Sequence, residues 1–361
     1  MEYILTKIFA TFLLLMSGFS LLFGRAQSEQ PQPEHPQLEF DYREYVADYD
    51  RSFLSANPHQ IHTIERDGFT LHAREFGDPD SPSFDAEAAP VIALHGFPDN
   101  LHLFDGIVPF IAQERRIITF DHLGWGRSDK PRAAVDPADP RAGEHVYDTG
   151  SLLRDLDVVI DHFDTEQVVL VAHDLSAFPV IDWAIANPTR VEHMIILNSV
   201  YFSSENLFPP QGIFVFASQE ALYSREYMTT IASRYPAFFQ AMVEEQVQRF
   251  YENEEARRRY TPLFVEFAPD IRPAFFQMNS FLSAEVQTRT INYFQGGGRF
   301  AFDGPVTVIF GVDDPYLTEE LSFEFAAAFP NSSVRNIDNA GHYVQLDAPE
   351  RTGRYILSAL E

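Results

Sequence analysis

The chain has 361 residues, and its 45% apolar content with 34 Phe is enough for a large folded core, which argues against a disordered protein. Its 26 Lys and Arg residues face 53 Asp and Glu residues, and the net charge of −27 repels polyanions, so nucleic acid is not an expected partner. There is no Cys, which excludes disulfide bonds and thiolate metal sites.

The first 26 residues form a segment of their own. Lys7 precedes a nearly unbroken apolar run, which ends with the small residues of Gly24-Arg25-Ala26. This pattern predicts a secretory signal peptide and a secreted or periplasmic protein. The run is about long enough to cross a bilayer, so an uncleaved membrane anchor is the alternative. Residues 27–60 form an N-terminal extension, of which 27–40 are expected not to pack because they are rich in Gln, Glu and Pro.

Residues 61–202 alternate short apolar strands with helical stretches. A hairpin is expected around Asp67-Gly68, because this pair lies between two strand-like runs. The further strands are expected at 91–94, 116–120, 168–172 and 194–197, and helices are expected up to residue 111, at 149–163 and at 178–186. This alternation predicts a parallel sheet covered on both faces, with the ligand site at the carboxyl ends of the strands.

The strand at 168–172 ends at a tight turn with Asp174 at its apex, before a helix that begins near Phe178. Small residues stand two positions before and after the apex, at Ala172 and Ser176. A strained nucleophile elbow needs small residues at these two places. The apex of such an elbow is usually a serine, and the aspartate here carries most of the functional argument.

Residues 203–304 break the alternation and are expected to be a helical cap, inserted after the sixth strand. The cap is rich in Phe, and some of these side chains are expected to line an apolar pocket over the sheet. Helices are expected at 219–232, 237–251 and 274–281. The sheet resumes in residues 305–361, with strands at 306–310 and 333–337, a helix at 319–329 and a last helix after Pro349. The predicted class is α/β, with a doubly wound, mostly parallel sheet.

Five motifs, in this order along the chain, resemble those of the α/β-hydrolase superfamily, and within it the aspartate-nucleophile branch of haloalkane dehalogenases and epoxide hydrolases. They are His95-Gly96-Phe97-Pro98, Gly124-Trp125-Gly126-Arg127-Ser128-Asp129-Lys130-Pro131, His173-Asp174, Gly311-Val312-Asp313-Asp314-Pro315 and Gly341-His342. The resemblance extends from about residue 60 to the end of the chain, and it implies the α/β-hydrolase fold. No metal or other cofactor is expected, since no ligand spacing accompanies the histidines.

Asp174, Asp314 and His342 follow three strands in the chain order of nucleophile, acid and histidine. A carboxylate with an unperturbed pKa of about 4 is ionised at neutral pH, so Asp174 can attack a saturated carbon and form an ester. His342 then activates a water, and the acid holds the imidazole in the required tautomer. Asp314 is preferred over Asp313 for the acid, because Gly311-x-x-Asp314 is the spacing that the family implies.

The amides of Phe97 and Leu175 are expected to form the oxyanion hole. Their side chains depart from the dehalogenase pattern, in which an indole N–H follows the nucleophile and an Asn often stands at the place of Phe97. A cap segment resembles the one that carries a proton-donating Tyr in epoxide hydrolases, with Phe294 at the catalytic place. Tyr293 is its neighbour, and a shift of one residue would put it there. Trp125 is expected to pack at the substrate site.

We therefore expect a hydrolase that forms a covalent aspartyl ester with a small apolar substrate, by dehalogenase-like hydrolysis of a carbon–halogen bond. Epoxide hydrolysis is the alternative. A non-catalytic binding protein of the same fold is a further alternative, motivated by Leu175 and the missing halide donors. A serine esterase is less favoured, because Ser176 lies two residues beyond the apex of the elbow.

Overall fold

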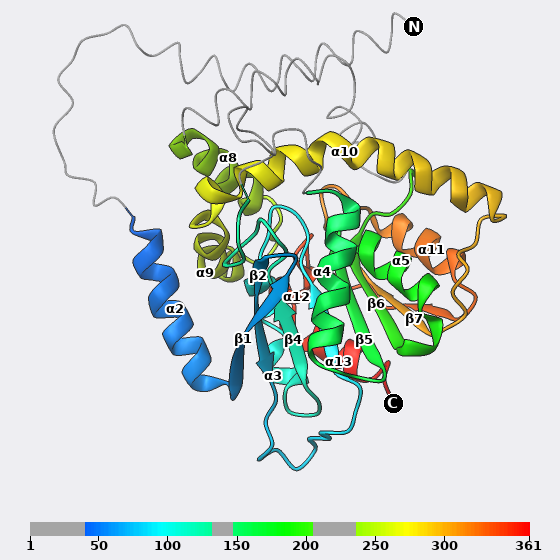
Figure 1. The fold of residues 1–361 in the computed structure, drawn as a ribbon, viewed down its shortest axis with the longest axis horizontal. Helices are drawn as coiled ribbons and strands as arrows, with labels where there is room; N and C mark the ends of the chain where they lie inside the picture. Colours follow the sequence, from blue (N-terminus) through cyan, green and yellow to red (C-terminus); the bar gives the residue numbers. More distant parts are fainter. Residues whose placement is uncertain (1–39, 132–146, 205–235) are drawn as a thin grey trace, which may run out of the picture. The chain divides into compact units, whose positions relative to one another are not determined.

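The structure is a computed structural model that describes residues 40–131, 147–204 and 236–361, apart from a few side chains inside α8 and α10. The chain divides into two units, Met1–Asp41 and Tyr42–Glu361, and all the elements below belong to the second unit (Figure 1). The expected signal segment at residues 1–26 therefore lies outside the described residues. Within the described ranges, no helix has both the length and the apolar character needed to span a bilayer.

An eight-stranded sheet forms the centre of this unit, in the order β1-β2-β4-β3-β5-β6-β7-β8. The strands are β1 (His59–Arg66), β2 (Phe69–Phe76), β3 (Val91–Leu94), β4 (Ile117–Phe120), β5 (Val168–Asp174), β6 (Val191–Ser199), β7 (Val306–Ile309) and β8 (Ser332–Val334). β1 and β2 form the expected antiparallel hairpin, and β2 also pairs antiparallel with β4. All other pairs are parallel. The predicted α/β class with a mostly parallel sheet is confirmed.

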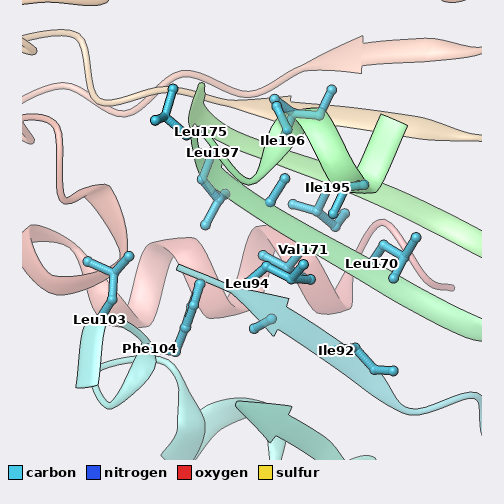
Figure 2. Close-up of a cluster of buried hydrophobic side chains, with 14 of the residues drawn as sticks. Ile92, Leu94, Leu103, Phe104, Leu170, Val171, Leu175, Ile195, Ile196 and Leu197 are labelled. Carbon is cyan, nitrogen blue, oxygen red and sulfur yellow. The ribbon is translucent and has the colours of Figure 1, made fainter. Parts of the chain in front are cut away.

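The central strands are buried along their length, because helices cover both faces of the sheet. Every residue of β3, β4 and β7 is buried. Figure 2 shows Ile92 of β3 and Leu170 of β5, which are partners on neighbouring strands, among the buried side chains of this core. Such short, continuous apolar runs are typical of parallel strands that have no solvent-facing side.

Helices flank the sheet in two packed pairs. α4 (Thr149–His162) packs against α5 (Ala177–Ala186), and α3 (Val108–Ile111) packs against α13 (Pro349–Leu357). The remaining elements of the core are η1 (Leu101–Phe104), η2 (Pro188–Arg190), α11 (Glu319–Ala328) and α12 (Val344–Asp347). The predicted helices at 149–163, 178–186 and 319–329 agree with α4, α5 and α11 to within a residue.

Between β6 and β7 the described residues form helices only: α8 (Pro236–Gln248), α9 (Glu254–Val265) and α10 (Ala268–Gln295). Figure 1 shows α10 running across the top of the sheet, with α8 beside its first turns. The predicted helix at 274–281 lies in the first half of the much longer α10, and α9 was not predicted. Asn253 caps α9 by accepting hydrogen bonds from the amides of Glu255 and Ala256. The expected helix at 219–232 lies outside the described residues.

The N-terminal extension contains a further helix that the sequence analysis missed, α2 (Tyr42–Ala56). It buries Val46 and Phe53 and packs against α9 of the cap. The extension is therefore part of the packed fold from Tyr42 onward, and β1 begins at His59, two residues before the predicted strand. Most side chains of α2 are polar, so the sequence lacks the strong apolar pattern from which a helix can be predicted.

Candidate active site

Asp174 ends β5 in a strained conformation, with a φ of 53° that only a small fraction of non-glycine residues adopt. The chain then enters α5 directly at Ala177. Gly96, at the end of β3, lies so close that a Cβ built on it would be 2.4 Å from the Cβ of Asp174. The predicted elbow is therefore present, and a glycine at position 96 leaves room for its apex.

The Ser176 hydroxyl stabilises the elbow by hydrogen bonds to backbone groups. Its hydroxyl oxygen lies 2.7 Å from the carbonyl oxygen of Leu94 and accepts a hydrogen bond of 2.7 Å from the amide of His173. The side chain is fully buried. A hydroxyl in this position is occupied by backbone groups, which argues against a serine nucleophile and explains why a serine can stand where a glycine is usual.

The carboxylate of Asp174 faces the two amides expected to form an oxyanion hole. The Phe97 amide donates a 3.0 Å hydrogen bond to Oδ2, and the Leu175 amide also donates to this carboxylate. Burial raises the pKa of Asp174 above its ordinary value, and the charge of His342 and the two amides offset only part of this rise. Asp174, Phe97 and Leu175 thus lie together. The two amides that would stabilise an oxyanion contact the carboxylate that would become an ester.

His342 and Asp314 form a hydrogen-bonded pair across the carboxyl ends of the strands. Nδ1 of His342 lies 2.7 Å from Oδ2 of Asp314, and both side chains are buried. The other oxygen of Asp314 accepts hydrogen bonds from the amides of Tyr316 and Leu317, at 2.8 and 3.0 Å. Asp313 is exposed instead. Of the two acids considered from the sequence, Asp314 is the one that contacts the histidine.

Asn198 is a residue of this site that the sequence analysis did not identify. It lies near the end of β6, and its Nδ2 donates a 2.8 Å hydrogen bond to Oδ2 of Asp314. Its own oxygen accepts a 2.8 Å hydrogen bond from the amide of Gly311. The signal in the sequence is a polar residue at the end of a buried strand.

The charges around His342 determine its protonation. Burial lowers the pKa of the imidazole, but the adjacent carboxylate of Asp314 raises it, and the charges of Asp174 and Asp99 add to that effect. The net result is a pKa raised to about 9. The resting histidine is therefore protonated near neutral pH, which stabilises the ionised form of Asp174.

Cap side chains pack against His342 on one side of the site and against Phe97 on the other. The Phe250 ring, just after α8, lies 4.7 Å from the His342 ring. On the other side, Phe275 of α10 stacks on Phe97 at 4.6 Å, and Phe239 of α8 packs edge-on against Phe275 at 5.0 Å. The rings of Phe97, Phe275 and Phe239 therefore form an apolar wall that extends from the loop after β3 into the cap.

Trp125 lies within this wall. Its ring packs edge-on against Phe97 at 5.3 Å and is 2% exposed. A cavity of about 10 Å³ is lined by Phe97, Trp125, Leu175 and Met278, among others. This volume holds about one water-sized group. Trp125 thus borders the space beside the oxyanion hole.

Tyr293 and Phe294 lie elsewhere. The Tyr293 ring stacks on Phe202 at 4.7 Å and also contacts Phe300, at the far end of α10. Phe294 is 68% exposed. Among the described residues, neither makes a contact with Asp174 or His342, so this placement gives no support to their expected roles in substrate binding.

Within the described ranges, no group of three or more His, Cys, Asp or Glu side chains is arranged to hold a metal ion. The two other histidines near the elbow are engaged by the backbone. Nδ1 of His95 bonds the Gly96 carbonyl at 2.8 Å, and its Nε2 accepts from the His122 amide at 3.1 Å. His173 bonds the carbonyl of His342.

Residues 89–349 match the family model described as the alpha/beta hydrolase fold. Among curated proteins, a cis-3-alkyl-4-alkyloxetan-2-one decarboxylase from Xanthomonas campestris pv. campestris is 27% identical over 274 residues, covering 72% of this chain and 84% of the relative.

Two solved structures resemble the fold at identities too low to indicate an activity. An esterase from Thermogutta terrifontis has a TM-score of 0.62 and 18% identity, covering 83% of this chain and 98% of its own. An ancestral haloalkane dehalogenase has a TM-score of 0.63 and 19% identity, again covering 83% of this chain and 98% of its own.

Proposed function

The chain belongs to the alpha/beta hydrolase fold family, and we propose that it hydrolyses a small apolar substrate through a covalent ester on Asp174. The observation that carries this proposal is the carboxylate at the apex of the elbow, 3.0 Å from the Phe97 amide and beside a His342–Asp314 pair. A carboxylate needs no base for its attack, so the histidine is free to act on the second step.

In the first step, an oxygen of Asp174 forms a bond to a saturated carbon, while the bond from that carbon to the leaving group breaks and its electron pair departs with the leaving group. In the second step, His342 takes a proton from a water whose oxygen attacks the ester carbonyl. The oxyanion that forms is stabilised by the amides of Phe97 and Leu175. Collapse releases the alcohol, which takes the proton from His342, and the carboxyl group of Asp174 loses the second proton of the water to solvent, which restores the carboxylate.

For the leaving group we favour one that departs without a proton, and a halide is the first candidate. The described wall beside Asp174 is mostly apolar, with Phe97, Leu175 and Phe275 on it. Epoxide opening, the alternative, needs an acid for the ring oxygen. Tyr293, the nearest match to such an acid in sequence, stacks on Phe202 instead.

An oxetan-2-one is a second candidate substrate, because opening this strained ring at its alkyl carbon expels a carboxylate, which also departs without a proton. The relative from Xanthomonas campestris, at 27% identity, is named for substrates of this class. Both candidates require Asp174 as the nucleophile, and both form an ester between its carboxylate and an alkyl carbon.

The test is to trap the ester. In His342→Phe, hydrolysis of the ester lacks its base, so the ester should persist and add the substrate mass to the peptide that contains Asp174. The panel comprises haloalkanes, epoxides and oxetan-2-ones with matched alkyl chains, and it is analysed by mass spectrometry, halide release and diol formation. Asp174→Asn in the same background is the control and should give no adduct. No adduct with any member of the panel would favour a non-catalytic binding protein.

A further inference from the structure

Asp99 is a second buried carboxylate near His342, and it has no part in the steps above. It follows Phe97 by two positions, and its side chain is 1% exposed. Oδ1 accepts a hydrogen bond from the hydroxyl of Tyr343, the residue that follows the base. Oδ2 lies 3.7 Å from Nδ1 of His173. Neither Oδ2 of Asp99 nor Nδ1 of His173 has a hydrogen-bond partner among the described residues. Unpaired buried polar atoms are rare enough to require an explanation.

His173 determines which of these atoms needs a proton. Its Nε2 lies 3.0 Å from the carbonyl oxygen of His342, and because a carbonyl only accepts, Nε2 carries the proton. Burial lowers the pKa of His173 and the charge of His342 lowers it further, so the ring is neutral and Nδ1 is an acceptor. Oδ2 of Asp99 can pair with Nδ1 only when it carries a proton itself.

Asp99 is able to carry that proton near neutral pH. Burial raises its pKa to about 7, against the hydrogen bond from Tyr343, and the charge of Asp174 adds to the increase. At 3.7 Å the two atoms lie just beyond hydrogen-bonding distance, so protonated Asp99 needs only a small approach to donate to His173. Ionised Asp99 turns one acceptor toward another. The other titratable groups that face this carboxyl are His342, beside Asp174, and Tyr251, which follows α8.

We propose that Asp99 is a positioning residue for the base. It holds the main chain of His342 and Tyr343 at two points, through the Tyr343 hydroxyl and through His173. Since Asp99 belongs to the same loop as Phe97, these contacts join the oxyanion hole to the base and set the reach of His342 toward the ester on Asp174. The inference rests on the proposed function, because the base acts on that ester.

Two substitutions separate the hydrogen bonds from the charge. Asn at position 99 imitates the protonated acid, since its amide donates to His173 and its oxygen accepts from Tyr343. Leu has a similar size and makes neither bond. In single-turnover experiments, Asp99→Leu should slow ester hydrolysis about 100-fold, the cost of a misplaced catalytic group, and leave ester formation near the wild-type rate. Asp99→Asn should hydrolyse the ester close to the wild-type rate.

The pH dependence of ester hydrolysis separates a positioning role from a merely structural one, which would not change it. In the wild-type enzyme the contact to His173 weakens as the pH rises through the pKa of Asp99, whereas in Asp99→Asn it persists at every pH. The ratio of the Asn variant's hydrolysis rate to the wild-type rate should therefore rise with pH. A constant ratio, or equal slowing of both steps in Asp99→Leu, would overturn the proposal.

Asp105→Leu is the matched control. Asp105 is also a buried carboxylate paired with a histidine, at 2.7 Å from Nδ1 of His102, but it does not contact the main chain of the base. Neither step should change in this variant beyond what its stability explains.

A measurement without substrate distinguishes failure of this inference from failure of the proposed function. Amide hydrogen exchange in the segment 341–344 should rise in Asp99→Leu and stay low in Asp99→Asn and Asp105→Leu. If no substrate forms an adduct in any variant, the proposed function fails, but the exchange still decides the positioning role. Unchanged exchange in Asp99→Leu overturns it.

Discussion

Nδ1 of His342 and Oδ2 of Asp314 lie 2.7 Å apart, at the ends of segments that follow β8 and β7. Asn198 on the neighbouring strand bonds the same oxygen of Asp314 at 2.8 Å. The acid is thereby held by a side chain from β6, so three adjacent strands define the direction in which the imidazole points. The geometry predicts which step each partner affects.

Asp314→Asn should slow ester hydrolysis and leave ester formation nearly unchanged. The amide cannot hold the imidazole in the required tautomer or stabilise its charged form, and in a serine protease this loss costs on the order of 10⁴-fold. Quench-flow measurement of ester formation and decay separates the steps. Asp313→Asn, at the exposed neighbouring carboxylate, is the control and should keep both rates. A comparable loss in this control would reject the assignment of Asp314.

The rate of ester hydrolysis should rise with pH. His342 accepts a proton from water only when it is neutral, and the pKa of the resting imidazole is raised to about 9 by Asp314 and other carboxylates, against the effect of burial. Formation of the ester removes the negative charge of Asp174, which is one of the charges that raise this pKa. The inflection for decay of the isolated ester should therefore lie below 9. An ester whose decay does not depend on pH between 6 and about 9 would contradict His342 as the base.

Gly96→Ala should impair ester formation. The added methyl would lie 2.4 Å from the Cβ and 2.8 Å from Oδ2 of Asp174, so the carboxylate has to move away from the Phe97 amide. A displaced carboxylate no longer has the geometry for attack, and a misplacement of about 1 Å costs on the order of 100-fold. Rates of ester formation with a trapped adduct test this expectation, and thermal unfolding checks that the fold is intact. Gly150→Ala in α4 is the control, because its Cβ would meet no atom closer than 3.3 Å.

Much of the core could be predicted from the sequence, because its signals are local. The continuous apolar runs of β3 and β4 indicate buried parallel strands, and the abrupt end of β5 at Asp174 indicates the elbow. What the sequence could not show are pairings between distant residues. Asn198 and Asp314 are 116 positions apart, and the hydrogen bond between them depends on the order of β6 and β7 in the sheet.

The cap and the N-terminal extension were harder for a related reason. Register along a long helix depends on what it packs against, so Tyr293 could be aligned by sequence with an acid but lies on Phe202 in the structure. The helix α2 carries a weak apolar pattern, and its contacts are mostly polar and aromatic. One of them, between Tyr45 and the Arg259 carbonyl, spans 214 positions.

The ionic contacts of α2 yield a prediction about stability. Asp50 accepts a 2.7 Å hydrogen bond from Arg74, which is 1% exposed, and a 2.5 Å hydrogen bond from Arg127. Asp50→Asn removes the negative charge from a buried guanidinium, and breaking a buried ion pair in this way costs about 3 kcal/mol. Chemical denaturation should show this decrease in the free energy of unfolding.

Asp48→Asn on the same helix provides the comparison. Asp48 pairs with Arg51 at 3.0 Å, but 62% and 76% of these two side chains are exposed. Exposed pairs of this kind contribute between about 0 and 1 kcal/mol. The two substituted positions are two residues apart on the same helix and carry the same chemical change, so a difference between the variants reports burial. Equal effects would mean that α2 is not anchored to the core through Arg74, and that its contacts with the cap hold it instead.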